Sequence, residues 1–157
     1  MVLYSNKLGS GEPFIILHGF LGMGDNWKTI AGQFAEEGYE MHLIDQRNHG
    51  RSFHDDNFNY DLLAEDLKEY CDSQDIKKVI ILGHSMGGKT AMKFAVKYPE
   101  MVEKLIVADI SPKYYAPHHQ QILAGLKALS ENEEALKSRG DADDFLGTHI
   151  TDWGTRQ

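Results

Sequence analysis

The residues most clearly suited to catalysing a reaction are 83–87, whose sequence GHSMG matches the pattern G-x-S-x-G. An apolar run over residues 79–82 precedes this pattern, and a helical pattern follows it over residues 88–96. A serine at such a strand–turn–helix junction is exposed as a nucleophile. The flanking glycines have no Cβ, so the backbone can turn sharply between them. The spacing therefore predicts that Ser85 attacks an electrophilic carbon.

A carbonyl attacked by Ser85 would need N–H donors already aimed at its developing oxyanion. The backbone amides of Phe20 and Met86 are suitably placed, because each follows the end of an expected strand. Two histidines belong to the same segments, His18 in the loop and His84 in the turn. We expect these histidines to orient the backbone or to line the substrate pocket.

Asp109 is the candidate acid, because it follows directly on the apolar run over residues 105–108. One crossover helix and one strand fill the sequence between Ser85 and Asp109. The two side chains should therefore emerge from neighbouring parallel strands, about 4.8 Å apart in the sheet. A histidine placed between them could bond to both, which predicts a Ser-Asp-His triad.

The elements that must position these residues are short apolar runs that alternate with longer amphipathic ones. We expect strands over residues 14–17, 40–44, 79–82 and 105–108. Helices are expected from residues 25–26 to about residue 38, over residues 59–70, and after Ser85 as far as residues 98–99. This alternation predicts an α/β fold, with a mostly parallel sheet and helices on both faces. From residue 111 the sequence becomes polar and mostly helical, and no later strand is evident.

The composition is that of a globular chain, with 157 residues, a net charge of −8 and 41% hydrophobic residues. No basic patch stands out, which argues against nucleic acid or an anionic membrane surface as partner. No segment resembles a signal peptide or a membrane span. The single cysteine, Cys71, allows no intrachain disulfide and is expected to be inert, which fits a cytoplasmic location. No metal or cofactor is predicted, because no Cys/His cluster has ligand spacing and no phosphate-binding glycine loop is present.

Four segments together resemble the α/β-hydrolase family: LHGF at 17–20, DQRNHGRS at 45–52, GHSMGGK at 83–89 and DISP at 109–112. They look like the branch of small intracellular esterases and abhydrolase-domain acyl hydrolases, whose substrates are acyl esters or thioesters. The resemblance extends over residues 2–120. It implies that residues 1–113 form the hydrolase core and that residues 114–157 begin a helical cap. It also implies that the acid is Asp109, in agreement with the spacing.

The catalytic histidine should follow the acid, beyond the cap and a further strand. We expect the last two strands and this histidine to be absent, so that the fold is incomplete and the chain is weak or inactive. His118, His119 and His149 follow Asp109 and are the alternative bases. Without the two strands, residues 105–108 would form an exposed sheet edge, which predicts an unstable or self-associated chain.

The sequence therefore favours a serine hydrolase that acts on small acyl esters or thioesters through an acyl-enzyme. Tyr114 and Leu123 could line the acyl pocket, although ordinary packing explains them nearly as well. Asp45 and Arg47 are expected to hold a structural turn rather than to act in catalysis. Two alternatives stay open. One is a non-catalytic, hydrolase-like binding module, and the other is a C–C hydrolase or lyase that uses the same nucleophile.

Overall fold

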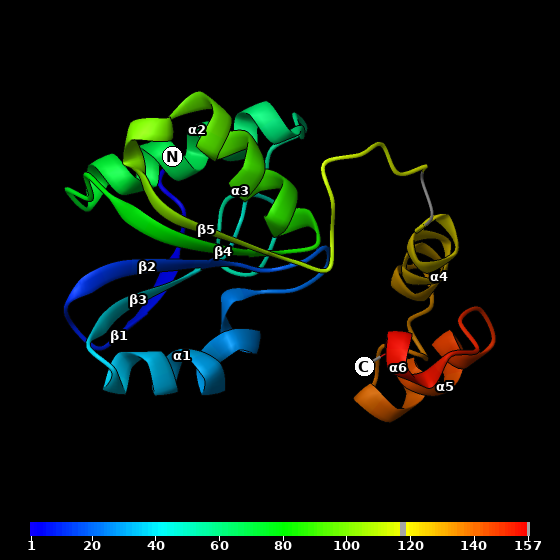
Figure 1. The fold of residues 1–157 in the computed structure, drawn as a ribbon. Helices are drawn as coiled ribbons and strands as arrows, with labels where there is room; N and C mark the ends of the chain where they lie inside the picture. The colour runs from blue at the N-terminus through cyan, green and yellow to red at the C-terminus, as the bar shows by residue number, and fades with distance from the viewer. Residues whose placement is uncertain (117–118, 157) are drawn as a thin grey trace. The chain divides into compact units, whose positions relative to one another are not determined.

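The computed structural model contains a five-stranded sheet (Figure 1). In chain order the strands are β1 (Ser5–Leu8), β2 (Glu12–Leu17), β3 (Tyr39–Ile44), β4 (Val79–His84) and β5 (Val102–Ala108). Their spatial order is β1-β3-β2-β4-β5. The pairs β2–β3, β2–β4 and β4–β5 are parallel, and only β1 runs antiparallel to its neighbour. The predicted mostly parallel sheet is confirmed.

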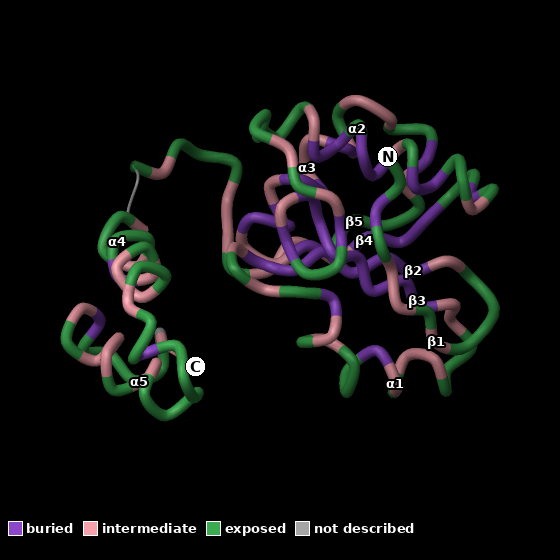
Figure 2. Tube along the Cα trace, turned by 180° about the vertical axis from the view of Figure 1, so that it is seen from behind, coloured by how far each residue is buried: buried purple, intermediate pink, exposed green. Residues whose placement is uncertain are grey.

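Helices cover both faces of this sheet, as the continuous apolar strands predict. A 3₁₀ turn, η1 (Gly24–Trp27), leads into α1 (Lys28–Glu36) on one face, while α2 (Tyr60–Ser73) and α3 (Met86–Lys97) cover the other (Figure 1). Strand β2 supplies both cores, because successive side chains point to opposite faces. Phe14 and Ile16 pack with the α1 cluster, and Ile15 and Leu17 with the cluster beneath α2 and α3. Figure 2 shows buried residues along β2, β3 and β4 and in α2 and α3.

The order of the strands reverses at β2 and β4. The chain passes from β2 to β3 on one side, and then crosses to β4 on the other side of β2. In open α/β sheets, ligands bind beyond the carboxyl ends of the strands at such a reversal of strand order. The loop after β2 and the turn after β4 meet at this point, which identifies it as the place to look for a site.

Several boundaries differ from those predicted. The short edge strand β1 is polar and was not predicted. Trp27 ends the 3₁₀ turn, and the α-helix proper begins at Lys28. Strand β5 begins at Val102, directly after the short 3₁₀ turn η2 (Pro99–Met101). Asn59 is the N-cap of α2, where its side chain accepts a hydrogen bond from the Leu62 backbone N–H at 2.9 Å.

The structure describes residues 1–116 and 119–156, which form two units, Met1–Pro112 and Lys113–Gln157. The second unit contains α4 (Gln120–Ser130), α5 (Arg139–Gly147) and α6 (Trp153–Arg156). Over residues 119–156 it has no strand, as expected. His118, one of the alternative bases, lies outside the described residues. Among those described, no helix combines the length and the apolar character that a bilayer crossing requires.

A buried histidine lies within β3. His42 is 1% exposed, and its Nδ1 lies 2.6 Å from the Tyr70 hydroxyl. Its Nε2 has no hydrogen-bond partner in the described part of the chain and lies 3.5 Å from a Glu40 carboxylate oxygen. Burial lowers the pKa of His42 to about 4, with Glu40 opposing this shift and Lys7 adding to it. His42 is therefore neutral at pH 7.

This pKa predicts an acid-dependent loss of stability. Between pH 6.5 and about 4 the unfolded chain binds more protons at this histidine than the folded chain does, so stability falls as the pH falls. The loss levels off below the folded pKa and amounts to at most about 3 kcal/mol. Urea unfolding at neutral pH and at pH near 4.5 should show a smaller pH effect in His42→Leu than in the unmodified chain. An equal loss in both would contradict the prediction.

Strand β5 is an open edge of the sheet. Two of its aliphatic side chains are exposed, Leu105 at 39% and Ile106 at 42%. A sheet edge with apolar side chains and unpaired backbone groups is a template for pairing with another chain. This observation agrees with the expected edge, while self-association itself stays a prediction.

We expect the 157-residue chain to associate in a concentration-dependent way, and Ile106→Lys to reduce this association by placing a charge on the edge. Analytical ultracentrifugation over a range of concentrations measures the effect. Val96→Lys is the matched control, because Val96 is a 79% exposed aliphatic residue on α3 and the charge change is the same. A monomer at all concentrations, with a sharp cooperative melt, would contradict the prediction.

Candidate active site

Ser85 occupies a strained turn between β4 and α3. Its backbone has φ 51° and ψ −114°, a conformation that residues other than glycine rarely adopt. Strain of this kind costs about 1–3 kcal/mol and persists only where the surroundings hold it. Here the Ser85 N–H donates to the Ala108 carbonyl at 3.0 Å, and the Ser85 carbonyl accepts from the Lys89 N–H at 3.2 Å. The turn therefore presents Ser85 at the carboxyl end of the sheet.

The two motif glycines are required by close backbone approach. A Cβ on Gly83 would lie 2.3 Å from the Gly87 carbonyl oxygen. A Cβ on Gly87 would lie 2.3 Å from the Leu17 carbonyl oxygen and 2.6 Å from that of His18. Any side chain at either position would displace backbone. The G-x-S-x-G pattern is thus explained by the packing of the turn against the end of β2.

The loop after β2 lies against this turn. The Gly87 N–H donates to the His18 carbonyl at 3.1 Å. A Cβ on Gly19 would lie 3.4 Å from the Ser85 Cβ and 2.9 Å from His84 Nδ1. The loop then turns at Leu21, which has φ 61°. The segment that carries the Phe20 amide and the helix start that carries the Met86 amide are therefore neighbours, on the same side of Ser85.

His18 is buried and fully engaged. Its Nδ1 lies 2.7 Å from the Gly19 carbonyl oxygen, and its Nε2 accepts from the Gln46 N–H at 3.1 Å. Burial lowers the pKa of His18, against the hydrogen bond to Gly19, which raises it. A neutral ring with both nitrogens occupied has no capacity left to take a proton from Ser85. His18 thus contacts backbone groups of Gly19 and Gln46, while its expected place in a substrate pocket stays a prediction.

Gln46 and Thr90 were not singled out from the sequence, yet both support the site. The Gln46 side-chain amide donates to the His18 carbonyl at 2.8 Å, and the Thr90 hydroxyl donates to Gln46 Oε1 at 2.9 Å. Both side chains are buried, at 1% exposure. A polar residue on the buried face of a helix is the signal that could have revealed Thr90, because buried polar groups need partners.

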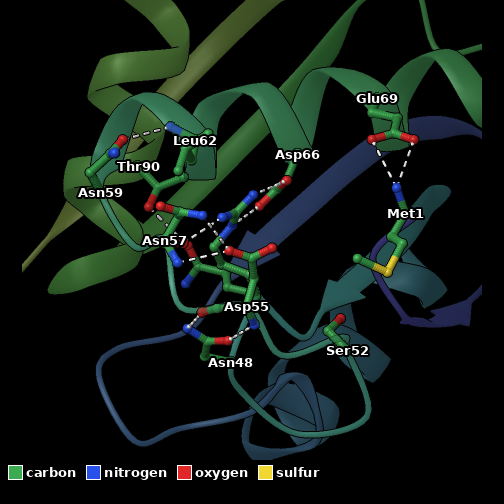
Figure 3. A network of polar contacts seen from close by, with 12 residues as sticks. Met1, Asn48, Ser52, Asp55, Asn57, Asn59, Leu62, Asp66, Glu69 and Thr90 are labelled. Carbon is green, nitrogen blue, oxygen red and sulfur yellow. Dashed lines mark hydrogen bonds and ion pairs between the residues drawn. The ribbon is translucent and has the colours of Figure 1, made fainter.

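The turn after β3 is a structural network, as predicted. Asp45 accepts from the Gly24 N–H at 2.7 Å and from the Arg51 N–H at 2.9 Å. Arg47 makes a buried bidentate pair with Asp66, with N–O distances of 2.5 and 2.7 Å. The Asp66 carboxylate is the main cause of the raised pKa of Arg47. Figure 3 shows Asp66 and Thr90 within this network.

Asp109 follows directly on β5, as predicted. The register pairs His84 with Ala108, so Ser85 and Asp109 are the next residues on adjacent parallel strands. Asp109 also has a positive φ, 57°. Its side chain is 86% exposed, and a carboxylate oxygen lies 3.8 Å from His84 Nε2. The structure thus brings the candidate nucleophile and acid to the same strand ends, and His84 lies beside the acid.

The other histidines lie elsewhere. His49 is buried at 7% exposure, with Nε2 accepting from the Leu21 N–H at 3.2 Å and Nδ1 lying 2.9 Å from the Arg47 carbonyl oxygen. His42 lies within β3, and His54 is exposed in the loop before α2. His119 and His149 belong to the second unit, as do Tyr114 and Leu123. The roles foreseen for those four residues stay predictions.

A cavity of about 350 Å³ opens beside the loop after β2, within the first unit. Its walls come from residues 18–20 and 22 of the loop, Asn26 and Trp27 of η1, Ile30 of α1 and His84 of β4. The Trp27 ring lies against His84, with centroids 5.9 Å apart. From the sequence we expected Trp27 to be core. It does pack on the α1 cluster, but it also forms a wall of this cavity.

Comparison with known proteins supports the family expected from the motifs. The family model described as the alpha/beta hydrolase fold matches residues 12–134. The chain belongs to the α/β hydrolase family. A solved structure titled marine microorganism esterase matches with a TM-score of 0.93 and 45% identity, covering 99% of this chain and 61% of that one. The predicted α/β hydrolase fold is confirmed.

The chain is similar to two curated relatives that are named as an esterase and a lipase. Esterase YbfF of Escherichia coli is 32% identical, over 94% of this chain and 58% of its own length. The sn-1-specific diacylglycerol lipase ABHD11 of Xenopus laevis is 34% identical, over 94% of this chain and 49% of its own length. The chain thus spans about half the length of the curated relatives it matches, and its similarity is to esterases and lipases.

The strain at Ser85 predicts that glycine is more stable than alanine at this position. Both substitutions remove the hydroxyl, but only glycine adopts φ 51° without steric cost. After the greater flexibility of glycine in the unfolded chain is subtracted, we expect Ser85→Gly to exceed Ser85→Ala in stability by about 1 kcal/mol. Urea unfolding of the two variants side by side measures this difference. Equal stability, or a more stable alanine variant, would show that the turn is relaxed.

Proposed function

We propose that this chain provides the nucleophile half of a serine hydrolase that cleaves small carboxylic esters or thioesters. The observation that carries the proposal is the strained Ser85 turn, which lies against the loop after β2 that carries the Phe20 amide, here called the oxyanion loop. Ser85 and Asp109 each follow directly on the paired ends of β4 and β5. The similarity to proteins named as an esterase and a lipase supports the same reaction class.

In the proposed reaction, Ser85 Oγ attacks the carbonyl carbon and loses its proton to a histidine base. The amides of Phe20 and Met86 stabilise the oxyanion, and each such donor typically contributes about 10²–10³ in rate. The C–O or C–S bond to the leaving group then breaks, and the leaving group takes the proton. Water cleaves the resulting acyl-enzyme, which releases the carboxylic acid and restores the serine hydroxyl. This scheme uses no metal or cofactor.

We propose that the base is a histidine outside residues 1–157, which Asp109 would orient. This rests on two observations about the described residues. His18 and His49 have both ring nitrogens engaged. His84, which lies near Asp109, precedes Ser85 in the chain, whereas the triad of this fold has the order nucleophile, acid, histidine. Without a base, a serine hydroxyl is a poor nucleophile at neutral pH, so residues 1–157 by themselves should be weakly active.

We also propose a cytoplasmic location. Its support is the one cysteine, Cys71, which is buried and unpaired. Burial raises the pKa of its thiol to about 12, so the group is unreactive.

The test of the hydrolase is covalent labelling of the native protein. We expect a fluorophosphonate to label it and p-nitrophenyl esters to give a burst of nitrophenol, with both signals lost in Ser85→Ala. Ser10→Ala, an exposed serine in the β1–β2 turn, is the matched control and should keep both. Asp109→Asn should lower turnover by about 10⁴, as expected for the orienting acid of a triad.

Retention of both signals in Ser85→Ala would refute the proposal. Absence of labelling and of turnover in the unmodified native protein would instead favour the non-catalytic binding module. Parallel assays with an oxygen ester and a thioester of the same acyl group separate the two substrate classes. Turnover of a C–C substrate with neither ester cleaved would favour the C–C hydrolase.

A further inference from the structure

The cavity beside the oxyanion loop has no role in the scheme so far, yet it opens next to the nucleophile. Gly19 and His84 belong to its walls, and Gly19 also faces Ser85, since a Cβ there would lie 3.4 Å from the Ser85 Cβ. Phe20, whose amide is the proposed oxyanion donor, is part of the same wall. A group bonded to a carbonyl carbon at Ser85 is therefore within reach of the cavity.

We propose that this cavity is the acyl subsite and that it takes a short, uncharged acyl chain. The inference rests on the proposed esterase function and names the part of the substrate that the cavity holds. The two sides of an ester make different demands on a pocket. The acyl group stays bonded to the serine after the first step, whereas the alcohol or thiol must leave before water can attack. A recess walled by the oxyanion loop suits the group that stays.

The walls determine the chemistry of this acyl group. The walls combine the apolar side chains of Phe20, Trp27 and Ile30 with the polar side chains of Asn26 and of two histidines, and the residues that line the cavity include no Asp, Glu, Lys or Arg. A charged acyl group, such as a half-ester of a diacid, would lose hydration there without meeting a Lys or Arg side chain to balance its charge. The subsite therefore selects uncharged acyl chains over charged ones.

The size of the cavity limits the length of the chain. Its volume of about 350 Å³ is near the lower end of the range of ligand pockets, about 300–1,000 Å³. Ile30, on α1, is 44% exposed, so this wall borders the solvent. An acyl chain that reaches past Ile30 would gain little further burial. We expect kcat/KM to rise with chain length up to the size of the cavity and then to stop rising.

The experiment changes the size of the cavity and reads the preferred chain length. In the native protein, Ile30→Trp should shift the preferred p-nitrophenyl ester toward acetate and lower kcat/KM for the hexanoate by about tenfold or more, the effect of a lost methylene-sized space. Thr29→Trp is the matched control, because Thr29 is the exposed neighbour on α1 and does not line the cavity. It should keep the unmodified profile. Ile30→Phe repeats the test with a smaller change if Ile30→Trp does not fold.

A second measurement does not depend on turnover. In Ser85→Ala, hexanoate should change the emission of Trp27, and the change should disappear when Trp27→Phe is added. Unchanged chain-length profiles in both Ile30 variants would overturn the subsite while leaving the esterase intact. If the unmodified protein shows neither ester cleavage nor fluorophosphonate labelling, the proposed function is refuted. In that event, a change in Trp27 emission would still support the cavity as an apolar binding site. No change in Trp27 emission would rule out this binding site as well.

Discussion

The geometry of the site depends on one carbonyl oxygen, that of His18. It accepts hydrogen bonds from the Gln46 side chain at 2.8 Å and from the Gly87 N–H at 3.1 Å. Three segments far apart in sequence meet there, namely the loop after β2, the turn after β3 and the first turn of α3. Because all of these groups are buried, a lost bond would leave a polar atom without water or partner, at a cost of about 1–3 kcal/mol. The loop after β2 and the turn at Ser85 are therefore fixed relative to each other.

The same arrangement explains how the chain tolerates strain at its functional end. Ser85 and Asp109 both have positive φ, and both follow directly on strands that pair in parallel. The strands are anchored by apolar side chains beneath α3, including Ala91 and Phe94, which are fully buried. Regular packing at the centre of the sheet thus holds an irregular backbone at its end. This separation of scaffold from site is what a preorganised catalytic geometry needs.

Much of this architecture could be predicted from the sequence, because its signals are local. Continuous apolar runs identified the three strands with buried residues, β2, β3 and β4, and the more exposed β5, while glycine spacing identified the turn at Ser85. Strand β1 escaped prediction because it is short and polar, and it forms only by pairing with β3. Gln46, Thr90 and the cavity wall at Trp27 escaped for a related reason. Their roles arise from contacts between distant segments, and a local pattern gives at most a hint of them, as the polar Thr90 does on the buried face of its helix.

The two edges of the sheet, as described, differ in chemistry. The edge at β1 carries Ser5, Asn6 and Lys7, polar residues that discourage the addition of another strand. The edge at β5 carries Leu105 and Ile106, and both are exposed. A sheet that can grow from one edge only has no means of propagating, because the first pairing uses that edge in both copies. Any strand-to-strand assembly of this unit is thereby limited to a closed, two-fold pair rather than an open filament.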